Sequence, residues 1–403
     1  MSVSIFDSFL TSSDMIAVFD DAAIMQSMLR FEQALAQAQA DVGLLPQTTA
    51  QTIADACDVQ RYDVQALILA SRRAGSLAIP LVKALKDTVA ASDKPAAAKV
   101  HFGGTSQDVI DTAMVLATRA AVQLLDDGLH DLTGRLLQLA EQHVATPVLA
   151  RTLMQPAQIT SLGFKMAAWL APLVRARARL RVAAARALQL QLGGAVGTLD
   201  VMGERGPAVA ERMAAILGLR APAAAWHTQR DEWVRLGLEV ALLSGSLGKV
   251  ATDLSLMAQG EIAELAEPSG DGRGGSSAMA HKRNPVSSMI ALAAAARTPQ
   301  HAAALLAAMG QQHERGLGNW QAELAEWPSL FLSAHGSLSA LNEAFAGLQV
   351  DSARMLRNIG DFKELMYPGA EQDAAQLALP AQRLAEQQLR QLGADITDLS
   401  TPT

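Results

Sequence analysis

The sequence predicts an all-α fold, and three observations favour it. Half of the 403 residues are hydrophobic, yet aromatic residues make up only 4%, and alanine and leucine dominate; helix formers therefore far outnumber strand-favouring side chains. Long segments repeat apolar residues at intervals of three and four, the spacing of one helix face. No alternating polar and apolar pattern of any length indicates a competing strand.

The first hundred residues contain short helical patterns. They extend from Met15 to Val42 and from Val64 to Ala90. We predict that residues 1–104 form an N-terminal helical domain.

The first long helix is predicted from about Thr105 to Val144. Thr105-Ser106-Gln107-Asp108 matches a capping box, with a hydroxyl at the start and a carboxylate three residues later. An apolar seam follows in steps of three and four: Val122, Leu125, Leu129, Leu132, Leu136 and Leu139. Such a seam packs nearly parallel helices at a shallow angle.

Four further long helices are predicted in the central region. Three of them extend from Gln158 to about Leu192, from Val286 to about His313, and from Glu323 to about Leu348. The fourth carries a second apolar seam: Leu243, Leu247, Val250, Leu254 and Met257. Residues 105–348 thus form a central long-helix bundle, in which the first helix spans roughly 55–60 Å at ~1.5 Å per residue. Rods this long and this apolar rarely stay monomeric, so we expect a homo-oligomer.

The sequence after Val350 is predicted to be short and mixed. Pro368, Gly369 and Pro380 are expected to break helices there. We predict a small C-terminal helical domain over residues 349–403.

Composition excludes several classes of protein. The net charge is −7 with no basic stripe, so nucleic acid is a poor candidate partner. Cys57 is the single cysteine, which excludes an intrachain disulfide and a cysteine-rich metal site. The chain begins without a basic secretory region and contains no apolar run of the ~18 residues needed to span a membrane. We expect a cytoplasmic protein with no membrane partner.

The most informative segment is the glycine-rich stretch 268–285. Prolines stand near both ends, and glycines exclude a helix or strand interior. The predicted loop carries Ser276, Lys282 and Asn284. It is suited to closing over an anion and moving a proton. A solvated linker is the alternative, and the helical segments on both sides argue against it.

Polar residues also gather at the joints between the long helices. His101 and the glycines after it precede a helix start at Thr105 and Ser106, where free N–H groups favour an anion; an ordinary helix cap is equally compatible, and His101 could be structural. Arg151, Thr152 and Gln155 suggest carboxylate binding, with a surface salt bridge as the alternative for Arg151. Two further clusters are the tight turn Gly193-Gly194-Ala195-Val196-Gly197-Thr198 and the charged turn His313-Glu314-Arg315.

Common cofactor motifs are missing from the sequence. There is no His-Glu-x-x-His pattern, the eight histidines are scattered, and no Gly-Lys-Ser/Thr ends the glycine-rich loop. No Gly-x-Ser-x-Gly nucleophile turn is present either. We expect neither a metal nor another cofactor.

These segments resemble the fumarase/aspartase superfamily, and within it the branch of adenylosuccinate lyase and the bacterial carboxymuconate-lactonizing enzymes. The loop Gly275-Ser276-Ser277-Ala278-Met279-Ala280-His281-Lys282-Arg283-Asn284-Pro285 is similar to the family's hallmark Gly-Ser-Ser-x-Met-Pro-x-Lys-x-Asn. The other matching blocks are residues 101–112, 151–152, 155–157, 194–198 and 226–231.

The resemblance implies a homotetramer whose helices share a central bundle, with active sites built by three subunits. It implies catalytic roles for Ser276, as proton donor, and Lys282. It also implies that a small polycarboxylate is held by His101, Thr105, Ser106, Arg151, Thr152, Gln155, Asn284 and Arg315. The family's C-terminal region is longer, so residues after about 350 are expected to form an incomplete third domain.

Two departures from the family pattern bear on the reaction. Leu153 stands where related lyases have a histidine that protonates the leaving group, and Ala280 replaces the loop proline. A lyase that expels an amine or hydroxide needs that acid. An internal lactonization does not, because the substrate's own ionised carboxylate is the nucleophile. The resemblance therefore favours a cycloisomerase acting on 3-carboxy-cis,cis-muconate in aromatic degradation.

Three alternatives remain at this point: a cycloisomerase of 3-sulfomuconate, a fumarate-releasing lyase like adenylosuccinate lyase, and an inactive helical scaffold. Leu153 argues against the second. Retention of Ser276, Lys282 and Asn284 argues against the third. The sequence leaves open the substrate's anionic group, the stereochemistry of addition, the role of His281 and which subunit supplies each residue.

Overall fold

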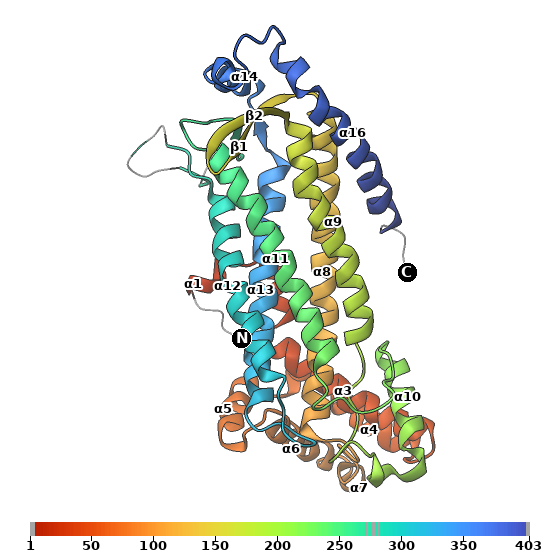
Figure 1. The fold of residues 1–403 in the computed structure, drawn as a ribbon. Coiled ribbons are helices and arrows are strands. Elements are labelled where there is room, and N and C mark those ends of the chain that lie inside the picture. The colour runs from red at the N-terminus through yellow and green to blue at the C-terminus, as the bar shows by residue number, and fades with distance from the viewer. Residues whose placement is uncertain (1–4, 271, 276–278, 280–281, 400–403) are drawn as a thin grey trace.

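The computed structural model describes residues 5–270, 272–275, 279 and 282–399, and helices build most of this part of the chain. The predicted all-α fold is confirmed. Long helices form an elongated bundle, with short helices gathered at one end and a hairpin and small helices at the other (Figure 1).

The N-terminal helices come first in the chain. They are α1 (Ile5–Ser8), α2 (Ser13–Val18), α3 (Asp21–Asp41), α4 (Gln47–Ala56), the 3-10 turn η1 (Val59–Arg61), α5 (Val64–Ala74), α6 (Ala78–Ala90) and α7 (Lys94–Ala97). Figure 1 shows α1 midway along the bundle and α3 to α7 at the lower end. Both predicted segments are interrupted. Asp20 begins α3 by accepting from the N–H of Ala22, and Gly75 ends α5 in the left-handed conformation at φ +72°.

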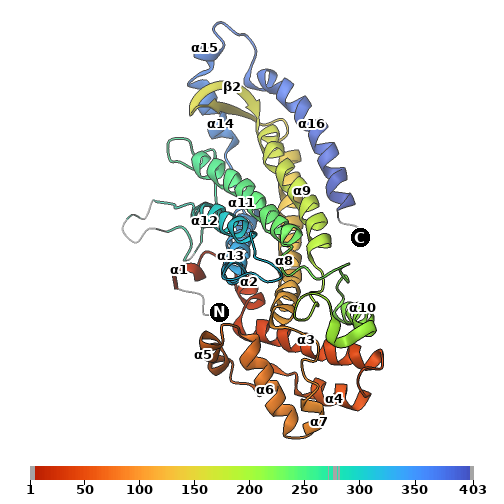
Figure 2. The same ribbon diagram turned by 60° about the horizontal axis from the view of Figure 1, so that its bottom comes forward.

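Five long helices form the bundle: α8 (Ser106–Gln142), α9 (Leu162–Ala187), α11 (Asp231–Met257), α12 (Val286–Ala308) and α13 (Asn319–Ala346). Figures 1 and 2 show them side by side along the length of the molecule. The seam of α8 is its buried face, since Leu125, Leu129, Leu132 and Leu136 are fully buried. Between α9 and α11 the chain forms the 3-10 turn η2 (Asp200–Arg205) and α10 (Gly206–Leu217).

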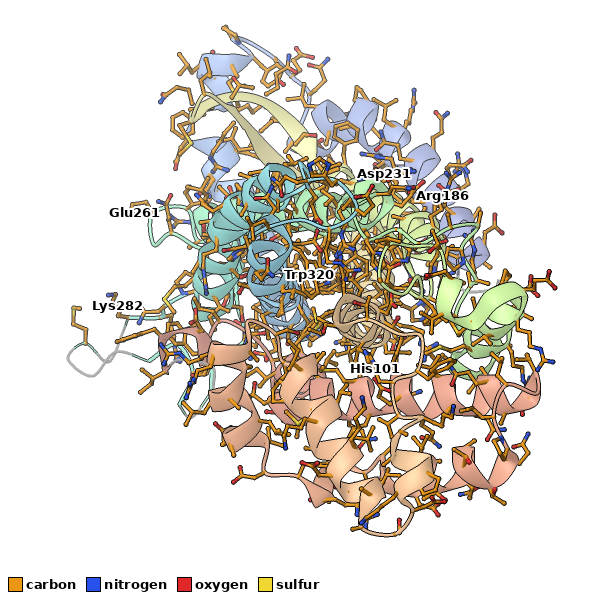
Figure 3. All side chains as sticks on the ribbon, turned by 90° about the horizontal axis from the view of Figure 1, so that it is seen from below. His101, Arg186, Asp231, Glu261, Lys282 and Trp320 are labelled. Atoms are coloured by element: carbon orange, nitrogen blue, oxygen red, sulfur yellow. The ribbon has the colours of Figure 1, made fainter. Side chains whose placement is uncertain are left out.

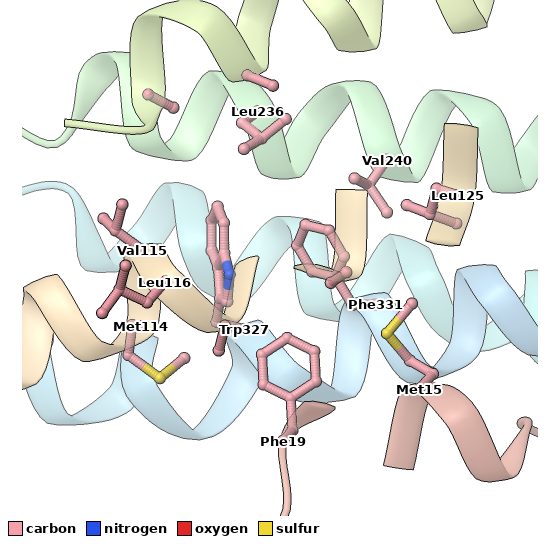
Figure 4. Packing of buried hydrophobic residues seen from close by; sticks show 14 of the residues in the cluster. Met15, Phe19, Met114, Val115, Leu116, Leu125, Leu236, Val240, Trp327 and Phe331 are labelled. Atoms are coloured by element: carbon pink, nitrogen blue, oxygen red, sulfur yellow. The ribbon is translucent and has the colours of Figure 1, made fainter. Parts of the chain in front are cut away.

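Aromatic side chains fill the core where the short helices meet the bundle. Trp327 of α13 stacks on Trp233 of α11 with ring centroids 3.9 Å apart. Phe331, one turn further along α13, packs between Trp327 and Phe19 (Figure 4). This packing anchors the N-terminal helices on the bundle, and such ring pairs add stability beyond the area they bury.

Helix α11 is the one described helix whose length and composition would allow it to cross a membrane, and half of its most apolar window is buried inside the protein. It packs against α9, α12 and α13. Burial against neighbouring helices is typical of a core helix in a bundle.

A β-hairpin at the upper end was not predicted. Strand β1 (Pro147–Thr152) pairs antiparallel with β2 (Gln155–Ser161), so α9 begins at Leu162 and not at Gln158. The two turn residues, Leu153 and Met154, have φ of +49° and +67°.

The C-terminal segment contains a longer helix than predicted. After the short pair β3 (Leu265–Ala266) and β4 (Gln349–Val350) come α14 (Ser352–Gly360), α15 (Lys363–Met366) and α16 (Ala374–Asp398). Pro380 lies inside α16 and does not end it. Apolar residues of α16 at helical spacing, among them Ala378, Ala385 and Leu389, are buried; this packing offsets the cost of one proline within the first two turns.

Candidate active site

Asp108 organises the start of α8. Its carboxylate is fully buried and accepts from the backbone N–H groups of Thr105, Gly193 and Gly194 at 2.9–3.0 Å. His227 lies 2.7 Å from the same carboxylate through Nε2. Asp108 thereby holds three separate segments in one place, and the Thr105 N–H donates to its carboxylate as a capping box requires.

A buried ion cluster supports this site from within the bundle. Arg230, at the start of α11, bridges Asp111 of α8 and Glu323 of α13, and each of these three side chains is at most 2% exposed. Trp320 donates to Asp111 at 2.9 Å, and the Arg230 guanidinium lies over the Trp226 ring. Arg230 faces both carboxylates at once, so moving the helices apart would leave a buried charge without its partner, and the cluster therefore fixes how the three helices meet.

His101 lies beside the helix start in a strained backbone conformation, with φ of +63°. Its Nδ1 is 2.6 Å from Glu32, a carboxylate that is 1% exposed. Burial opposes protonation of His101, but the charge and hydrogen bond of Glu32 outweigh it and raise the pKa of His101 above its ordinary value. No sequence pattern indicated Glu32, which lies 69 residues away.

Arg315 joins the turn between α12 and α13 to the same region. It donates to the Thr105 hydroxyl at 3.2 Å and to the carbonyl oxygens of Gly194 and Ala195. The structure therefore brings His101, Thr105, Ser106 and Arg315 together at one end of the bundle. Two hydroxyls, two cationic groups and the free N–H groups of a long helix make this end suitable for an anion.

Thr152 and Gln155 lie at the opposite end of the bundle, beside the tip of the hairpin. Both are exposed, and the turn residues Leu153 and Met154 are 97% and 67% exposed. Left-handed backbone at two non-glycine residues costs about 1–2 kcal/mol each. An apolar, strained tip that projects this far is a common feature of surfaces that meet another molecule.

Arg151 forms a salt bridge, the alternative that the sequence left open, and its partner is a buried carboxylate that sequence reasoning did not identify. Its two terminal nitrogens hold the buried Glu264 in a fork at 2.8 and 3.0 Å, and one of them also donates to the Leu149 carbonyl. Asn358 of α14 donates to Glu264 as well. Arginine carries five N–H donors, and Glu264 and Leu149 occupy some of them. A substrate could bind only to the remaining N–H groups of Arg151.

Lys165, in the first turn of α9, is a second cation beside Arg151 at the hairpin end of the bundle. Sequence reasoning did not identify it. Burial lowers its pKa, and Asp253 opposes the shift. Asp253 already accepts from Trp169 and Lys249. In the described part of the chain no ion pair of Lys165 is found within 4 Å, so positive charge exceeds negative charge here.

The loop between β3 and α12 contains Lys282 and Asn284, and its described residues form no helix, as predicted. Lys282 is exposed. The Asn284 backbone N–H donates to the Gly274 carbonyl at 2.8 Å, and the side chain donates to Gly275 at 3.3 Å. Ser276, Ala280 and His281 lie outside the described residues.

Within one chain, the hairpin residues and the loop residues of the predicted site both lie far from His101 and Thr105. His101 and Thr105 precede α8, whereas the hairpin follows it, and a helix of 37 residues is about 55 Å long. Figure 3 shows Lys282 at the edge of the molecule, well away from His101. One chain therefore cannot bring all these residues around one small ligand.

A metal centre is not evident in the described ranges. No group of three or more His, Cys, Asp or Glu side chains that could hold a metal ion occurs in them.

The family model described as "Lyase" matches residues 10–298, and the chain belongs to this family, the fumarase/aspartase superfamily that its motifs resemble. Among its relatives, the 3-carboxy-cis,cis-muconate cycloisomerases of Bradyrhizobium diazoefficiens and Pseudomonas aeruginosa are each 47% identical. The matches cover 87% and 88% of this chain and 78% of each relative.

Solved structures agree with this assignment. The 3-carboxy-cis,cis-muconate lactonizing enzyme of Pseudomonas putida is similar with a TM-score of 0.84 at 38% identity, over 98% of this chain and 89% of that chain. A fumarate lyase of Mesorhizobium sp. BNC1 is similar with a TM-score of 0.80 at 30% identity, over 97% and 89%.

Proposed function

We propose that the chain is an intramolecular lyase, a cycloisomerase that closes 3-carboxy-cis,cis-muconate to a carboxymuconolactone in aromatic degradation. The observation that carries the proposal is the 47% identity, over 87–88% of the chain, to proteins named for that activity. A nitrosuccinate lyase from Streptomyces davaonensis matches at 40% identity, so the wider family includes other reactions.

Leu153 supports the choice of reaction. It occupies the exposed tip of the hairpin, at the sequence position where the family pattern that this chain resembles has a histidine acid. An apolar residue at that position cannot protonate a leaving group. Ring closure by an internal carboxylate has no leaving group to protonate, so leucine is compatible with lactonization.

In the proposed mechanism the substrate trianion binds among donors from both ends of the bundle and from the loop. One wall of the site is formed by His101, Thr105, Ser106 and Arg315. The opposite wall is formed by Arg151, Thr152 and Gln155. The loop contributes Asn284. One carboxylate oxygen of the substrate attacks the ring-forming carbon, and negative charge develops on a second carboxylate. Lys282 stabilises that charge.

Ser276 then delivers a proton to the carbon alpha to the charged carboxylate, and its alkoxide regains a proton from solvent, because the reaction consumes one proton overall. In the reverse direction its alkoxide would remove that proton. A serine hydroxyl is a weak acid, so the proposal requires Lys282 close to the reacting oxygen. Transfer by a placed group contributes ~10²–10⁴-fold, and Ser276→Ala is expected to reduce turnover by at least that factor.

We further propose a cytoplasmic homotetramer in which three subunits build each site. The separation of about 55 Å along α8 supports this assembly, because residues at both ends can meet only if they come from different copies. The exposed apolar groove between α9, α11 and α12, lined by Pro172, Leu242 and Ala295 among others, offers a face for a second copy.

The test is an ultraviolet assay. Lactonization breaks a conjugated diene, so absorbance of 3-carboxymuconate should fall when enzyme is added, and 3-sulfomuconate serves as the alternative substrate. Adenylosuccinate should show no change. Fumarate release from adenylosuccinate without loss of either muconate would overturn the proposal.

A further inference from the structure

Glu267 lies at the upstream root of the loop and contacts its downstream root. Its two carboxylate oxygens accept from the backbone N–H groups of Ser287 and Ser288, each at 2.8 Å, and from the Ser288 hydroxyl at 2.6 Å. These serines lie in the first turn of α12, which begins directly after the loop, and both are buried.

The contact replaces a local helix cap. Pro285, the residue before α12, provides no side-chain hydrogen bond to the helix start. The first N–H groups of a helix have no partner within the helix and need one from outside. Glu267 supplies it from the other end of the loop, with a negative charge that the positive end of α12 favours.

Two further ties lie between Glu267 and the loop residues named in the mechanism. Arg273 donates to the Ser287 hydroxyl and forms an ion pair with Glu343 of α13 at 3.4 Å. Beyond it, the backbone of Gly274 accepts from Asn284 at 2.8 Å. Gly274 has a φ of +71°, and an added Cβ would lie 3.0 Å from the Asn284 carbonyl oxygen. This close approach of the two sides requires glycine.

We propose that Glu267 is a positioning residue of the reaction: by capping α12 it clamps the two roots of the loop together and so holds Lys282 and Asn284 in place. The inference rests on the proposed function only for the roles of Lys282 and Asn284. The clamp itself is defined by the contacts above. A position fixed before substrate arrives lowers the cost of ordering the loop on binding.

The consequence can be measured through trypsin cleavage of the folded protein after Lys282 and Arg283, two exposed residues. Cleavage of a folded chain follows the population of locally open states. Loss of the cap in Glu267→Ala is expected to speed cleavage at these bonds about tenfold, equivalent to about 1.4 kcal/mol. Glu267→Gln, which keeps the size and one acceptor, is expected to fall between wild type and Glu267→Ala.

Asp373→Ala is the matched control. Asp373 caps α16 by accepting from the Gln376 N–H at 2.8 Å, far along the chain from the loop. It should lower the melting midpoint about as much as Glu267→Ala and leave loop cleavage unchanged. Similar cleavage in wild type and Glu267→Ala, or equal acceleration in Asp373→Ala, would overturn the clamp.

A kinetic readout separates the clamp from the proposed function. If both are right, kcat/KM for 3-carboxymuconate falls about tenfold in Glu267→Ala and stays near wild type in Asp373→Ala. If wild type fails to turn over muconates, the proposed function fails while the cleavage comparison still decides the clamp. Unchanged kcat/KM alongside faster cleavage would refute the positioning role.

Discussion

At the scale of single residues, the buried charges are explained by their partners. His101 illustrates this, because burial opposes its protonation while the Glu32 carboxylate, 2.6 Å away on α3, raises its pKa. The second oxygen of Glu32 finds no hydrogen bond among the described residues. An anion buried this way is costly unless the neighbouring histidine carries a positive charge.

The first prediction concerns this pair. Because the folded pKa of His101 is raised, the pair stabilises the fold at pH values below the histidine reference of about 6.5, and this contribution is lost as the pH rises through the folded pKa. Glu32→Gln should move the His101 midpoint downward in an NMR titration. His143, whose pKa burial lowers, should keep its midpoint; an unmoved His101 would remove Glu32 as the cause.

The second prediction concerns a glycine in α13. A Cβ on Gly336 would lie 1.8 Å from the Leu10 carbonyl oxygen. Gly336→Ala should therefore lower the free energy of unfolding by about 1–3 kcal/mol, through displacement of the segment before α2. A Cβ added to Gly134 of α8 would meet no atom within 4 Å, so Gly134→Ala should raise stability by about 0.5–1 kcal/mol. Urea unfolding of both variants measures the contrast.

At the scale of elements, apolar spacing together with an alanine- and leucine-rich composition predicts the long helices, although α9 begins at Leu162 and not at Gln158. The seam from Leu125 to Leu136 is the buried face of α8, and Thr105 begins that helix at the predicted place. The hairpin was missed because its turn is Leu153-Met154, with neither the glycine nor the asparagine that usually indicates one. The prediction that Pro380 breaks a helix is wrong, because the packing of the buried face of α16 outweighs the cost of one proline.

The candidate site was only partly predictable for a similar reason. Loop and helix-cap residues are identified by local composition and motif. Glu264 and Glu323 were not, because each acts through an arginine about a hundred positions away in the sequence. Only the folded chain shows that Arg151 is already paired.

The third prediction tests the pairing of α8 with α9. Asp126 of α8, 14% exposed, lies in the forks of Arg177 and Arg181 of α9 at 2.8–2.9 Å. Burial alone would raise its pKa, but the two guanidinium groups lower it to about 2. Asp126 and its two arginines should add about 1–2 kcal/mol to the free energy of unfolding above pH 4. This contribution should be lost as the pH falls through 2.

Urea unfolding of Asp126→Asn at pH 7 and near pH 2 checks this expectation, with a deficit at the higher pH that shrinks at the lower. The neighbouring Asp127 is exposed and accepts only from Gln123 among the described contacts. Asp127→Asn should behave like wild type. Equal effects of the two substitutions would mean that the forks add nothing.

At the scale of the whole molecule, the length of α8 decides how a site can be assembled. Its two ends carry different parts of the predicted binding set, so mixing subunits with defects at different ends should restore intact sites. We predict that Thr105→Ala and Gln155→Ala proteins, refolded together at equal amounts, recover up to about a quarter of wild-type turnover if each site draws these residues from separate copies.

Either variant refolded alone is the control and should stay impaired. Recovery no greater than the average of the two separate preparations would contradict shared sites. Light scattering on the same samples should give four times the mass of one chain.

The hairpin tip has a consequence for engineering this protein. Leu153 and Met154 hold left-handed backbone that asparagine and glycine adopt without strain. The double change Leu153→Asn with Met154→Gly should make each isolated subunit sturdier, yet replace the apolar side chain proposed to suit ring closure. The melting temperature of the subunit would then rise while its turnover falls, both through changes at one two-residue turn.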